Sequence, residues 1–343
     1  MLRASFLGTV SALAMGLSAS LAHGATLRVP AQYPTIQAAV DAASAGDRIV
    51  VSRGRYCGAT LTKPVVLEGR GNPRVIGCPT SPQVTTDLRA GFFLPGSKGS
   101  NPASGSTIRG FVFDGRGVSS TNLEPLSFGV FGRFASDVVV ERNRFWGTVQ
   151  AVTNTGGDRW RIRKNRVKNL TLLDCTVRHC TGGDGIVIQV GRGALAASGG
   201  DAAALNRPED NVVVDNRVEG TAPDGFSAFS MVGVLLLSAD HTTLLSNHLT
   251  LRDNPNAAAL GQGIVISNTC CGLGTSFLPG SRLTTAAFND VRRSEAGIVV
   301  EGSDGANTLG LLLHRNRGPV TVEGELVDKA LRVVRPVRAQ PTQ

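Results

Sequence analysis

The most restrictive feature of this sequence is a repeat in which an asparagine follows a glycine or alanine at a fixed distance. The segment Gly233–Asn247 (GVLLLSADHTTLLSN) holds a glycine, a run of branched apolar residues, a polar turn, a second short apolar run and an asparagine 14 positions after the glycine. Gly129–Asn143 and Ala151–Asn165 keep the same offset without a gap. Three ungapped copies establish a repeat.

Three further copies match when residues are inserted at the turns, namely Gly185 to Asn216, Gly263 to Asn289 and Gly297 to Asn316. Between the asparagine that ends one copy and the start of the next, the shortest connection runs from Asn143 to Ala151. A repeat without insertions, here called the bare repeat, therefore has the length of the segment from Gly129 to the residue before Ala151. Short β-branched strands with polar turns at this period are typical of a solenoid, whose units bury their apolar faces only by stacking. A leucine-rich repeat is the alternative, but its L-x-x-L-x-L-x-x-N pattern is absent.

Alternation along the strands predicts which side chains face the core. The inward set is Ile186, Ile188, Val234, Leu236, Ile264 and Ile266. The outward set is Val187, Gln189, Leu235, Leu237, Val265, Ser267, Val299 and Glu301. We expect the recurring asparagine to adopt the left-handed backbone of the turn, because asparagine tolerates it. Stacked at roughly 4.8 Å per coil, the asparagine amides can also hydrogen-bond in a ladder.

Residues 1–22 are interpreted as a secretory signal peptide. Arg3 precedes an apolar run from Phe6 to Leu21, and a small-residue site follows at Ser20–Ala22, as in cleavable export signals. No other stretch contains the roughly 18 uninterrupted apolar residues of a membrane helix. We therefore expect a secreted or periplasmic monomer without a membrane span.

Charge indicates the kind of partner. The chain has 35 Lys and Arg against 26 Asp and Glu, a formal net charge of +9. Outside the cytoplasm, a basic protein meets anionic polysaccharide more readily than nucleic acid, so we expect a polysaccharide partner and no nucleic acid. The alternative is that the charge is a solvated surface spread over a long rod.

Six cysteines in an exported chain are disulfide candidates. Their order suggests pairs Cys57–Cys78 and Cys175–Cys180, each closing a short loop, and leaves the adjacent Cys270 and Cys271 open among 15 connectivities. A metal site at residues 174–180, with Asp174, Cys175, His179 and Cys180, lacks a second pair at zinc-site spacing. Calcium has no supporting motif, and no cofactor is expected.

Residues 35–45 predict a helix at the start of the solenoid. Thr35 can serve as N-cap, Gly46 lies past the end, and apolar residues at 36, 39, 40 and 43 form one stripe. Such a helix suits a cap for the open end of the core. Three short strands are expected next, at 48–52, 65–68 and 74–77.

The segment YPTIQAAVDAASAGDRIVVSRGRY (33–56), with KPVVLEGRG at 63–71, resembles the opening of right-handed parallel β-helix proteins of the pectin lyase-like superfamily. The resemblance covers about fifty residues, and the later repeats extend it over most of the chain. It implies an all-β fold, a right-handed parallel β-helix with three sheets, spanning about 23–330 with repeats at about 108–327. The resemblance also implies that ligands bind in a groove along one face. The sequence itself predicts a C-terminal tail at 331–343 that is either a last edge strand or disordered.

Inserted residues lengthen the loops at both ends of the strands that start at Gly185, Gly233 and Gly263. In a parallel coil these loops would stack into two walls flanking a shared floor, the kind of place where function concentrates. The outward residues of the floor are mostly apolar. An open trough and a face covered by its own loops therefore remain equal alternatives.

Polar residues near this floor are the candidate site. The catalytic candidates are Asp184, His179 and Asp224, and the substrate-binding candidates are Arg178, Gln189, Arg252, Gln262 and Glu301. On a polyuronate, an arginine would neutralise the sugar carboxylate while His179 removed the proton from the adjacent carbon in β-elimination. On a neutral glycan, Asp184 and Asp224 would need to lie about 5 to 9.5 Å apart for hydrolysis. A turn-stabilising or solvated role is the alternative for each residue.

The motifs of the enzyme families are mostly missing. Of the N-T-D, D-D, H-G and R-I-K set of polygalacturonase-like members, only Asp184–Ile186 and Arg161–Lys164 match faintly, and the D-P-H-D of alginate epimerase-like members is absent. No catalytic residue is carried over. The sequence thus predicts an exported β-helix that binds a polysaccharide and either cleaves it, as a lyase or hydrolase, or is a non-catalytic binding or surface-structural module.

Overall fold

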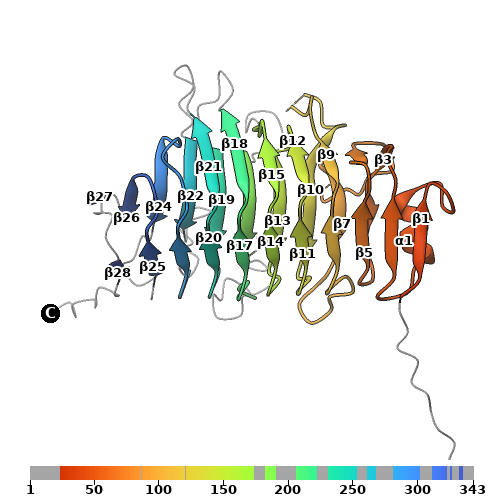
Figure 1. The fold of residues 1–343 in the computed structure, drawn as a ribbon, viewed down its shortest axis with the longest axis horizontal. Coiled ribbons are helices and arrows are strands. Elements are labelled where there is room, and N and C mark those ends of the chain that lie inside the picture. The colour runs from red at the N-terminus through yellow and green to blue at the C-terminus, as the bar shows by residue number, and fades with distance from the viewer. Residues whose placement is uncertain are drawn as a thin grey trace, which may run out of the picture.

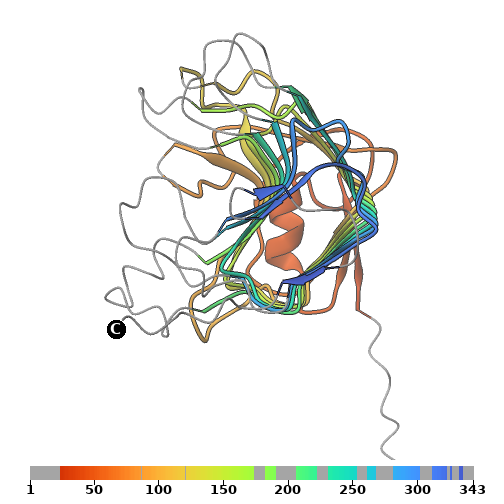
Figure 2. The ribbon, with the colours of Figure 1, turned by 90° about the vertical axis from the view of Figure 1, so that its left-hand side faces the viewer.

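The computed structural model describes residues 24–85, 87–119, 121–173, 182–190, 206–221, 231–252, 261–267, 281–301, 311–322, 325–326 and 332–334. These residues form a long rod in which one coil of chain lies on the next from the N-terminal to the C-terminal end (Figure 1). Seen along the rod, the coils superpose into one closed outline (Figure 2). In each complete coil the chain passes through three sheets, here named A, B and C, in that order.

Sheet A has 11 strands in the described part of the chain, paired in parallel except for the last two. Its strands are β1 (Thr26–Val29), β2 (Arg48–Val51), β5 (Val66–Gly69), β8 (Thr107–Arg109), β11 (Val139–Glu141), β14 (Arg161–Arg163), β17 (Val212–Val214), β20 (Thr243–Leu245), β23 (Thr285–Ala287), β25 (Leu311–His314) and β28 (Arg332–Val334). The three strands expected near the N-terminus are β2, β5 and, in sheet B, β6.

Sheet B contains seven strands among the described residues, all parallel. They are β3 (Arg55–Cys57), β6 (Arg74–Ile76), β9 (Val112–Asp114), β12 (Arg144–Trp146), β15 (Arg166–Lys168), β18 (Arg217–Thr221) and β21 (His248–Arg252). Sheets A and B meet at the corner that carries the recurring asparagines.

Sheet C has ten strands within the described ranges, parallel apart from the terminal pair β26 and β27. They are β4 (Ala59–Thr60), β7 (Arg89–Leu94), β10 (Leu126–Arg133), β13 (Gln150–Thr155), β16 (Asp184–Gln189), β19 (Met231–Leu237), β22 (Gly261–Ser267), β24 (Ala296–Glu301), β26 (Val320–Val322) and β27 (Glu325–Leu326). The predicted all-β parallel solenoid is confirmed.

One helix, α1 (Ile36–Ala42), lies within the described chain at the N-terminal end, and Figure 2 shows it across the outline of the coils. The Thr35 side chain accepts a hydrogen bond from the Ala38 N–H at 3.0 Å, which caps the first turn. Ile36, Ala39 and Val40 are buried against the interior. The role of this helix as a cap on the core remains a proposal.

The interior is filled by the side chains that alternation predicts to face inward. Ile186, Ile188, Val234, Leu236 and Ile264 are 0% exposed, and Ile266 is 1% exposed. Trp160 is also fully buried, and its indole N–H donates to the Ala135 carbonyl at 2.6 Å. One apolar cluster runs through the coils, as expected for units that bury their faces only by stacking.

The asparagines at the corner between sheets A and B form the predicted ladder. The Asn143 Oδ1 accepts from the Phe111 N–H at 3.0 Å. Each later Oδ1 accepts from the backbone N–H of the asparagine before it, also at 3.0 Å, through the series Asn143, Asn165, Asn216, Asn247, Asn289 and Asn316. Each Nδ2 also donates to a sheet A carbonyl of the preceding coil, for example Asn216 to Ile162 at 2.8 Å. Buried backbone groups at the corner are thereby satisfied.

The expected backbone conformation of these asparagines is wrong. The left-handed residue is the one before each asparagine, as at Arg142 (φ 54°), Lys164 (φ 55°) and Asp215 (φ 55°). The asparagine recurs for its side chain alone, because a buried amide both accepts and donates along the row.

The recurring glycine of the repeat is required by close packing. A Cβ placed on Gly233 would lie 2.5 Å from the carbonyl oxygen of Gly263, and one on Gly263 would lie 2.5 Å from that of Gly297. Both contacts are shorter than van der Waals separation, so the column admits almost no side chain. Ala151 shows that a methyl group fits in one coil.

A disulfide joins Cys57 and Cys78, as predicted from their order. Cys175, Cys180, Cys270 and Cys271 fall outside the described residues, as does the predicted signal peptide. In the part of the chain that is described, no helix is long and apolar enough to cross a membrane.

Candidate functional site

The outer face of sheet C, where the floor was predicted, is stacked in register. One column contains Phe128, Gln150, Asp184, Val232, Gln262 and Ala296. A second contains Phe131, Thr153, Val187, Leu235, Val265 and Val299. The second column contains Val187, Leu235, Val265 and Val299, which alternation predicted to face outward, whereas the first column was not part of that prediction.

This face is largely covered. Val187 is 0% exposed, Val265 4% and Val299 9%, although all three point away from the core. At its N-terminal half, a second apolar cluster packs Val84 and Leu88 against residues of the sheet. Of the two alternatives, the described part of the face fits a covered surface rather than an open trough.

A short chain of polar side chains is buried within this apolar face. The Thr153 hydroxyl donates to Gln150 Oε1 at 2.6 Å, and Gln150 Nε2 donates to Asp184 Oδ2 at 3.0 Å. Their exposures are 0%, 9% and 5% respectively. Sequence reasoning missed Gln150 and Thr153. The available signal was that Gln150 and Asp184 both stand immediately before the repeat's Ala or Gly.

The other predicted site residues lie apart from one another. Gln189 ends the strand that Asp184 begins, and the two are therefore roughly 16 Å apart. Gln262 shares Asp184's column, but Val232 stands between them. Arg252 ends β21 with an exposed side chain, and its backbone nitrogen lies beside Gly261 at the start of β22.

The remaining predicted site residues lie wholly or partly outside the described residues. Glu301 ends β24 in the column of Gln189, and its side chain is outside what the structure describes. Arg178, His179 and Asp224 belong to the ranges that are not described. Within the described ranges, no three His, Cys, Asp or Glu side chains gather closely enough to hold a metal ion.

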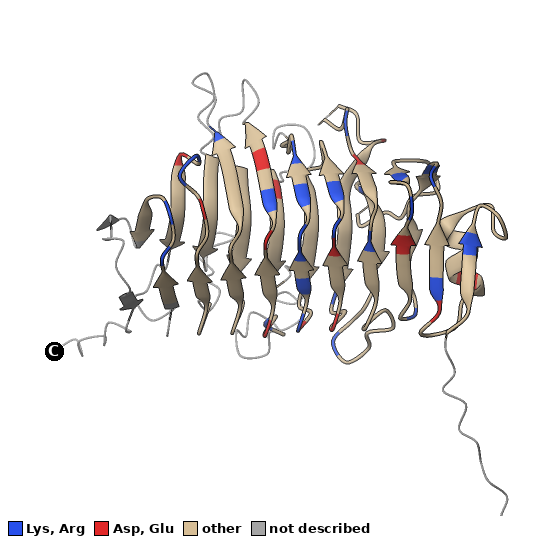
Figure 3. Cartoon of the chain, viewed as in Figure 1, with Lys and Arg blue, Asp and Glu red and all other residues tan. Residues whose placement is uncertain are grey.

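A second feature, absent from the sequence prediction, is a row of cations on sheet B. The register stacks the first residue of each strand into a column, here called the sheet B stripe, formed by Arg55, Arg74, Arg144, Arg166, Arg217 and His248. Val112 interrupts it between Arg74 and Arg144. In Figure 3 basic segments recur at the same height on β12, β15 and β18. The arginine side chains of the stripe are exposed, and that of Arg74, at 39%, is the least so.

The sheet B stripe carries more positive charge than its carboxylates neutralise. Glu219 is shared by Arg217, by Lys168 at 3.5 Å and by Arg166 at 3.9 Å. Arg55 and Arg144 make no ion pair among the described residues. The stripe therefore presents guanidinium groups to solvent in excess of acid.

The pKa of Glu219 is lowered even though its side chain is partly buried. Partial burial raises the pKa, but the Arg217 hydrogen bond and the charges of Lys168 and Arg166 outweigh that effect. Glu219 thus remains ionised at neutral pH and still offsets only one of the three cations around it.

The neighbouring corner and column extend this surface. Arg142 and Lys164 hold the left-handed positions beside the stripe and are exposed. In the next column of sheet B, Trp146 is half-buried beneath the Arg116 guanidinium, 4.7 Å from the ring centroid. Asp114 is neutralised by Arg116 at 2.8 Å and Arg74 at 3.4 Å.

Comparison with known proteins concerns the scaffold. No protein-family model and no curated protein matches the chain. Among solved structures, PfbA, a surface adhesin of Streptococcus pneumoniae, is 13% identical over 87% of this chain and 66% of its own, with a TM-score of 0.49. The alginate lyase from Paenibacillus sp. str. FPU-7 is 14% identical over 87% of this chain and 98% of its own, with a TM-score of 0.47.

The A-module of mannuronan C-5 epimerase AlgE6 from Azotobacter vinelandii is 16% identical over 84% of this chain and 93% of its own, with a TM-score of 0.32. The scaffold is a right-handed parallel β-helix, with its three sheets stacked in register. At these identities the similarity concerns the fold alone, and this β-helix spans 66% of the adhesin.

In this β-helix the two features lie on different sheets. The buried chain of Thr153, Gln150 and Asp184 belongs to sheet C, and the stripe belongs to sheet B. The first offers one ionisable carboxyl group protected from solvent, and the second offers many exposed cations along the rod. Binding of an anionic polymer requires the second arrangement.

Proposed function

We propose that this protein binds an acidic polysaccharide along the sheet B stripe. The observation that carries the proposal is the register: four exposed arginines, Arg55, Arg144, Arg166 and Arg217, and the partly paired Arg74 occupy one column with too few carboxylates to neutralise them. Like charges directly opposite each other in neighbouring strands destabilise a sheet. A bound polyanion relieves that repulsion.

The geometry favours a linear polymer over a small anion. Neighbouring strands place Arg144, Arg166 and Arg217 roughly 4.8 Å apart, and likewise Arg55 and Arg74. They form a straight row along the rod, so an extended chain with regularly spaced carboxylates can meet several of them together. Arginine suits this role since its fork of N–H donors matches a carboxylate.

The disulfide between Cys57 and Cys78 supports a polysaccharide over nucleic acid. Disulfides persist in oxidising compartments, where export would also place this chain. We therefore propose a secreted or periplasmic location, with the protein acting as a monomer.

The test is binding of polygalacturonate and alginate by isothermal titration calorimetry at low salt. The triple variant Arg144→Gln, Arg166→Gln and Arg217→Gln should weaken binding by at least about tenfold, because exposed ion pairs each contribute up to about 1 kcal/mol. The matched control removes three exposed arginines elsewhere, Arg28→Gln, Arg161→Gln and Arg293→Gln, and should retain most of the affinity. Binding should also weaken as salt is raised.

Two results would overturn the proposal. Equal loss in both triple variants would mean that only net charge matters, and no specific surface exists. Double-stranded DNA binding more tightly than either acidic glycan, and losing affinity in the stripe variant, would assign the stripe to nucleic acid.

A polysaccharide lyase or hydrolase acting on sheet C is the second candidate. It is favoured by Asp184, a residue that is 5% exposed and accepts a hydrogen bond from Gln150, because a shielded carboxyl group is a candidate general acid or base. Incubation with acidic and neutral glycans, followed by unsaturated products and new reducing ends, tests it. Activity that is lost in Asp184→Asn and kept in Asp41→Asn, an exposed carboxylate on α1, would support it, and no product from any glycan would exclude it.

A further inference from the structure

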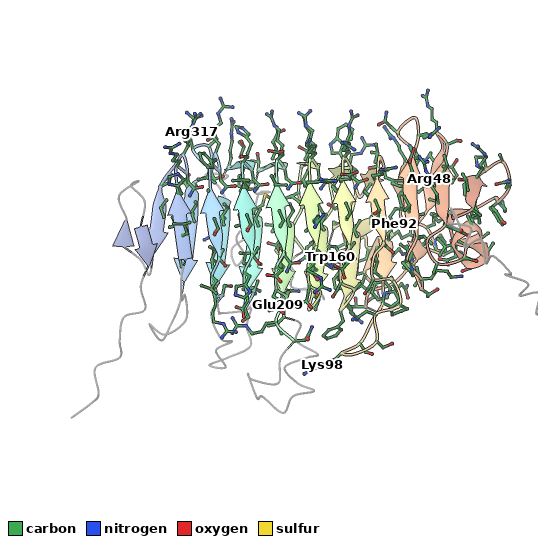
Figure 4. The ribbon with its side chains drawn as sticks, turned by 60° about the horizontal axis from the view of Figure 1, so that its bottom comes forward. Arg48, Phe92, Lys98, Trp160, Glu209 and Arg317 are labelled. Atoms are coloured by element: carbon green, nitrogen blue, oxygen red, sulfur yellow. A yellow bond between two sulfur atoms is a disulfide. The ribbon has the colours of Figure 1, made fainter. Side chains whose placement is uncertain are left out.

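A surface hollow of about 380 Å³ lies at the C-terminal end of the sheet B stripe, lined by Phe288, Asp290, Arg315 and Arg317. The column continues into it, because His248 pairs with Asp290 and Asp290 with Arg317 through isolated parallel bridges. In Figure 4 Arg317 projects from the end of the row of side chains that runs along the rod. The hollow therefore continues the stripe rather than forming a separate face.

Phe288 is unusual for its place in the fold. It occupies the left-handed corner position, with φ of 56°, and its side chain is 47% exposed. In earlier coils the same position holds polar residues, including Lys164 and Ser246. A bulky residue in this backbone region costs free energy, and an exposed ring regains little of it by burial.

The ring is framed by basic side chains. The Arg315 guanidinium lies over one face of the Phe288 ring, 5.8 Å from its centroid, and the His314 ring meets Phe288 edge-on at 5.4 Å. Arg315 and Arg317 are exposed and make no ion pair within the described ranges. The part of the Phe288 ring that Arg315 leaves uncovered, with two such guanidiniums lining the same hollow, can receive a ring that carries a carboxylate.

The one carboxylate that lines the hollow is already neutralised. Asp290 accepts from Arg292 Nε at 2.9 Å and Nη2 at 2.7 Å, and His248 Nδ1 lies 3.5 Å away. The hydrogen bonds from Arg292 hold the pKa of Asp290 at about 2, against the opposing effect of burial. Arg315 and Arg317 thus keep their charge for a ligand.

We propose that this hollow is a subsite for one uronate residue, with the sugar ring against Phe288 and its carboxylate between Arg315 and Arg317. The subsite rests on the proposed polysaccharide binding and deepens it, because it would hold one unit of the same polymer at the end of the stripe. The subsite can also bind a short oligosaccharide without help from the stripe.

The test uses trigalacturonate and a neutral trisaccharide, with calorimetry and saturation-transfer NMR. Phe288→Ser, which places at this corner the residue found at 246, should weaken trigalacturonate binding by about tenfold, whereas Phe288→Trp should restore it. Arg315→Gln with Arg317→Gln should remove the preference for the uronate over the neutral sugar. Thermal unfolding of each variant monitors the fold.

The outcomes separate this subsite from the stripe. The Arg144, Arg166 and Arg217 triple variant should lose polymer affinity while keeping trigalacturonate affinity. Phe288→Ser should lose trigalacturonate affinity while keeping polymer affinity. Trigalacturonate binding that is unchanged in Phe288→Ser, or absent from the wild-type protein, would overturn the subsite without bearing on the stripe.

Discussion

Asn165 Oδ1 accepts two hydrogen bonds from Asn143 of the preceding coil, from the backbone N–H at 3.0 Å and from the side-chain Nδ2 at 3.3 Å. One oxygen therefore fixes both the backbone and the side chain of its neighbour. Repeated along the row of asparagines, this contact sets the register of sheets A and B, and with it the alignment of the stripe.

Removing an asparagine from the middle of the ladder should destabilise the protein. Asn216→Ala leaves the buried Asn165 N–H and the Ile162 carbonyl without their partners, at a cost of about 1 to 3 kcal/mol in the free energy of unfolding. Urea denaturation followed by circular dichroism measures it. Asp215→Asn, at the exposed left-handed position next to it, should change stability little because asparagine tolerates that backbone.

The glycine column should resist even a methyl group. Gly233→Ala places a Cβ 2.5 Å from the Gly263 carbonyl oxygen, which is too close for van der Waals contact, so the coils must separate locally at a cost of about 1 to 3 kcal/mol. The reciprocal change Ala151→Gly should cost no more than about 1 kcal/mol. Equal stability of Gly233→Ala and the wild type would contradict the close packing described above.

The disulfide should contribute to stability at the N-terminal end of the rod. Cys57 and Cys78 have a sequence separation of 21, and closing a loop of this size stabilises a fold by about 3 kcal/mol. Cys57→Ser with Cys78→Ser should lower the melting temperature measured by calorimetry. Reductant should lower it less in this variant than in the wild type.

Acid should weaken the ion network on sheet A. Glu68 accepts hydrogen bonds from Arg109 at 2.7 Å, Arg70 at 2.9 Å and Arg48. Burial raises its pKa, but these bonds prevail and lower it from 4.5 to about 2. Since the folded pKa is the lower one, ionised Glu68 stabilises the fold above about pH 4.5, and this contribution is lost as the pH falls toward 2.

Glu68→Gln should therefore make the free energy of unfolding less dependent on pH between about 4.5 and 2. Urea titrations at several pH values measure the slope. Glu124→Gln removes an exposed carboxylate that makes no ion pair among the described residues and serves as control. The same slope in both variants would show that Glu68 adds nothing to acid sensitivity.

Prediction of the site was harder than prediction of the fold. Asp184 was predicted, but its partner Gln150 was not. The two residues belong to neighbouring coils, and their contact can be predicted only when the two copies of the repeat are aligned across the residues inserted between them. Arg144 and Arg166 are one bare repeat apart and both follow a ladder asparagine, so their stacking was available from the repeat. Arg217 also follows a repeat asparagine, Asn216, although inserted residues precede it, and the register confirms that it joins them.

The amino-acid sequence by itself determined the coil. A short repeat period, branched residues at alternate positions and a regularly placed asparagine permit few other structures, because each follows from local geometry and from the need to bury apolar side chains. Only the tertiary structure decided which surface carries charge and which is covered. Insertions of different length separate the stacked residues along the chain, and their alignment depends on hydrogen bonds between coils that no local pattern records.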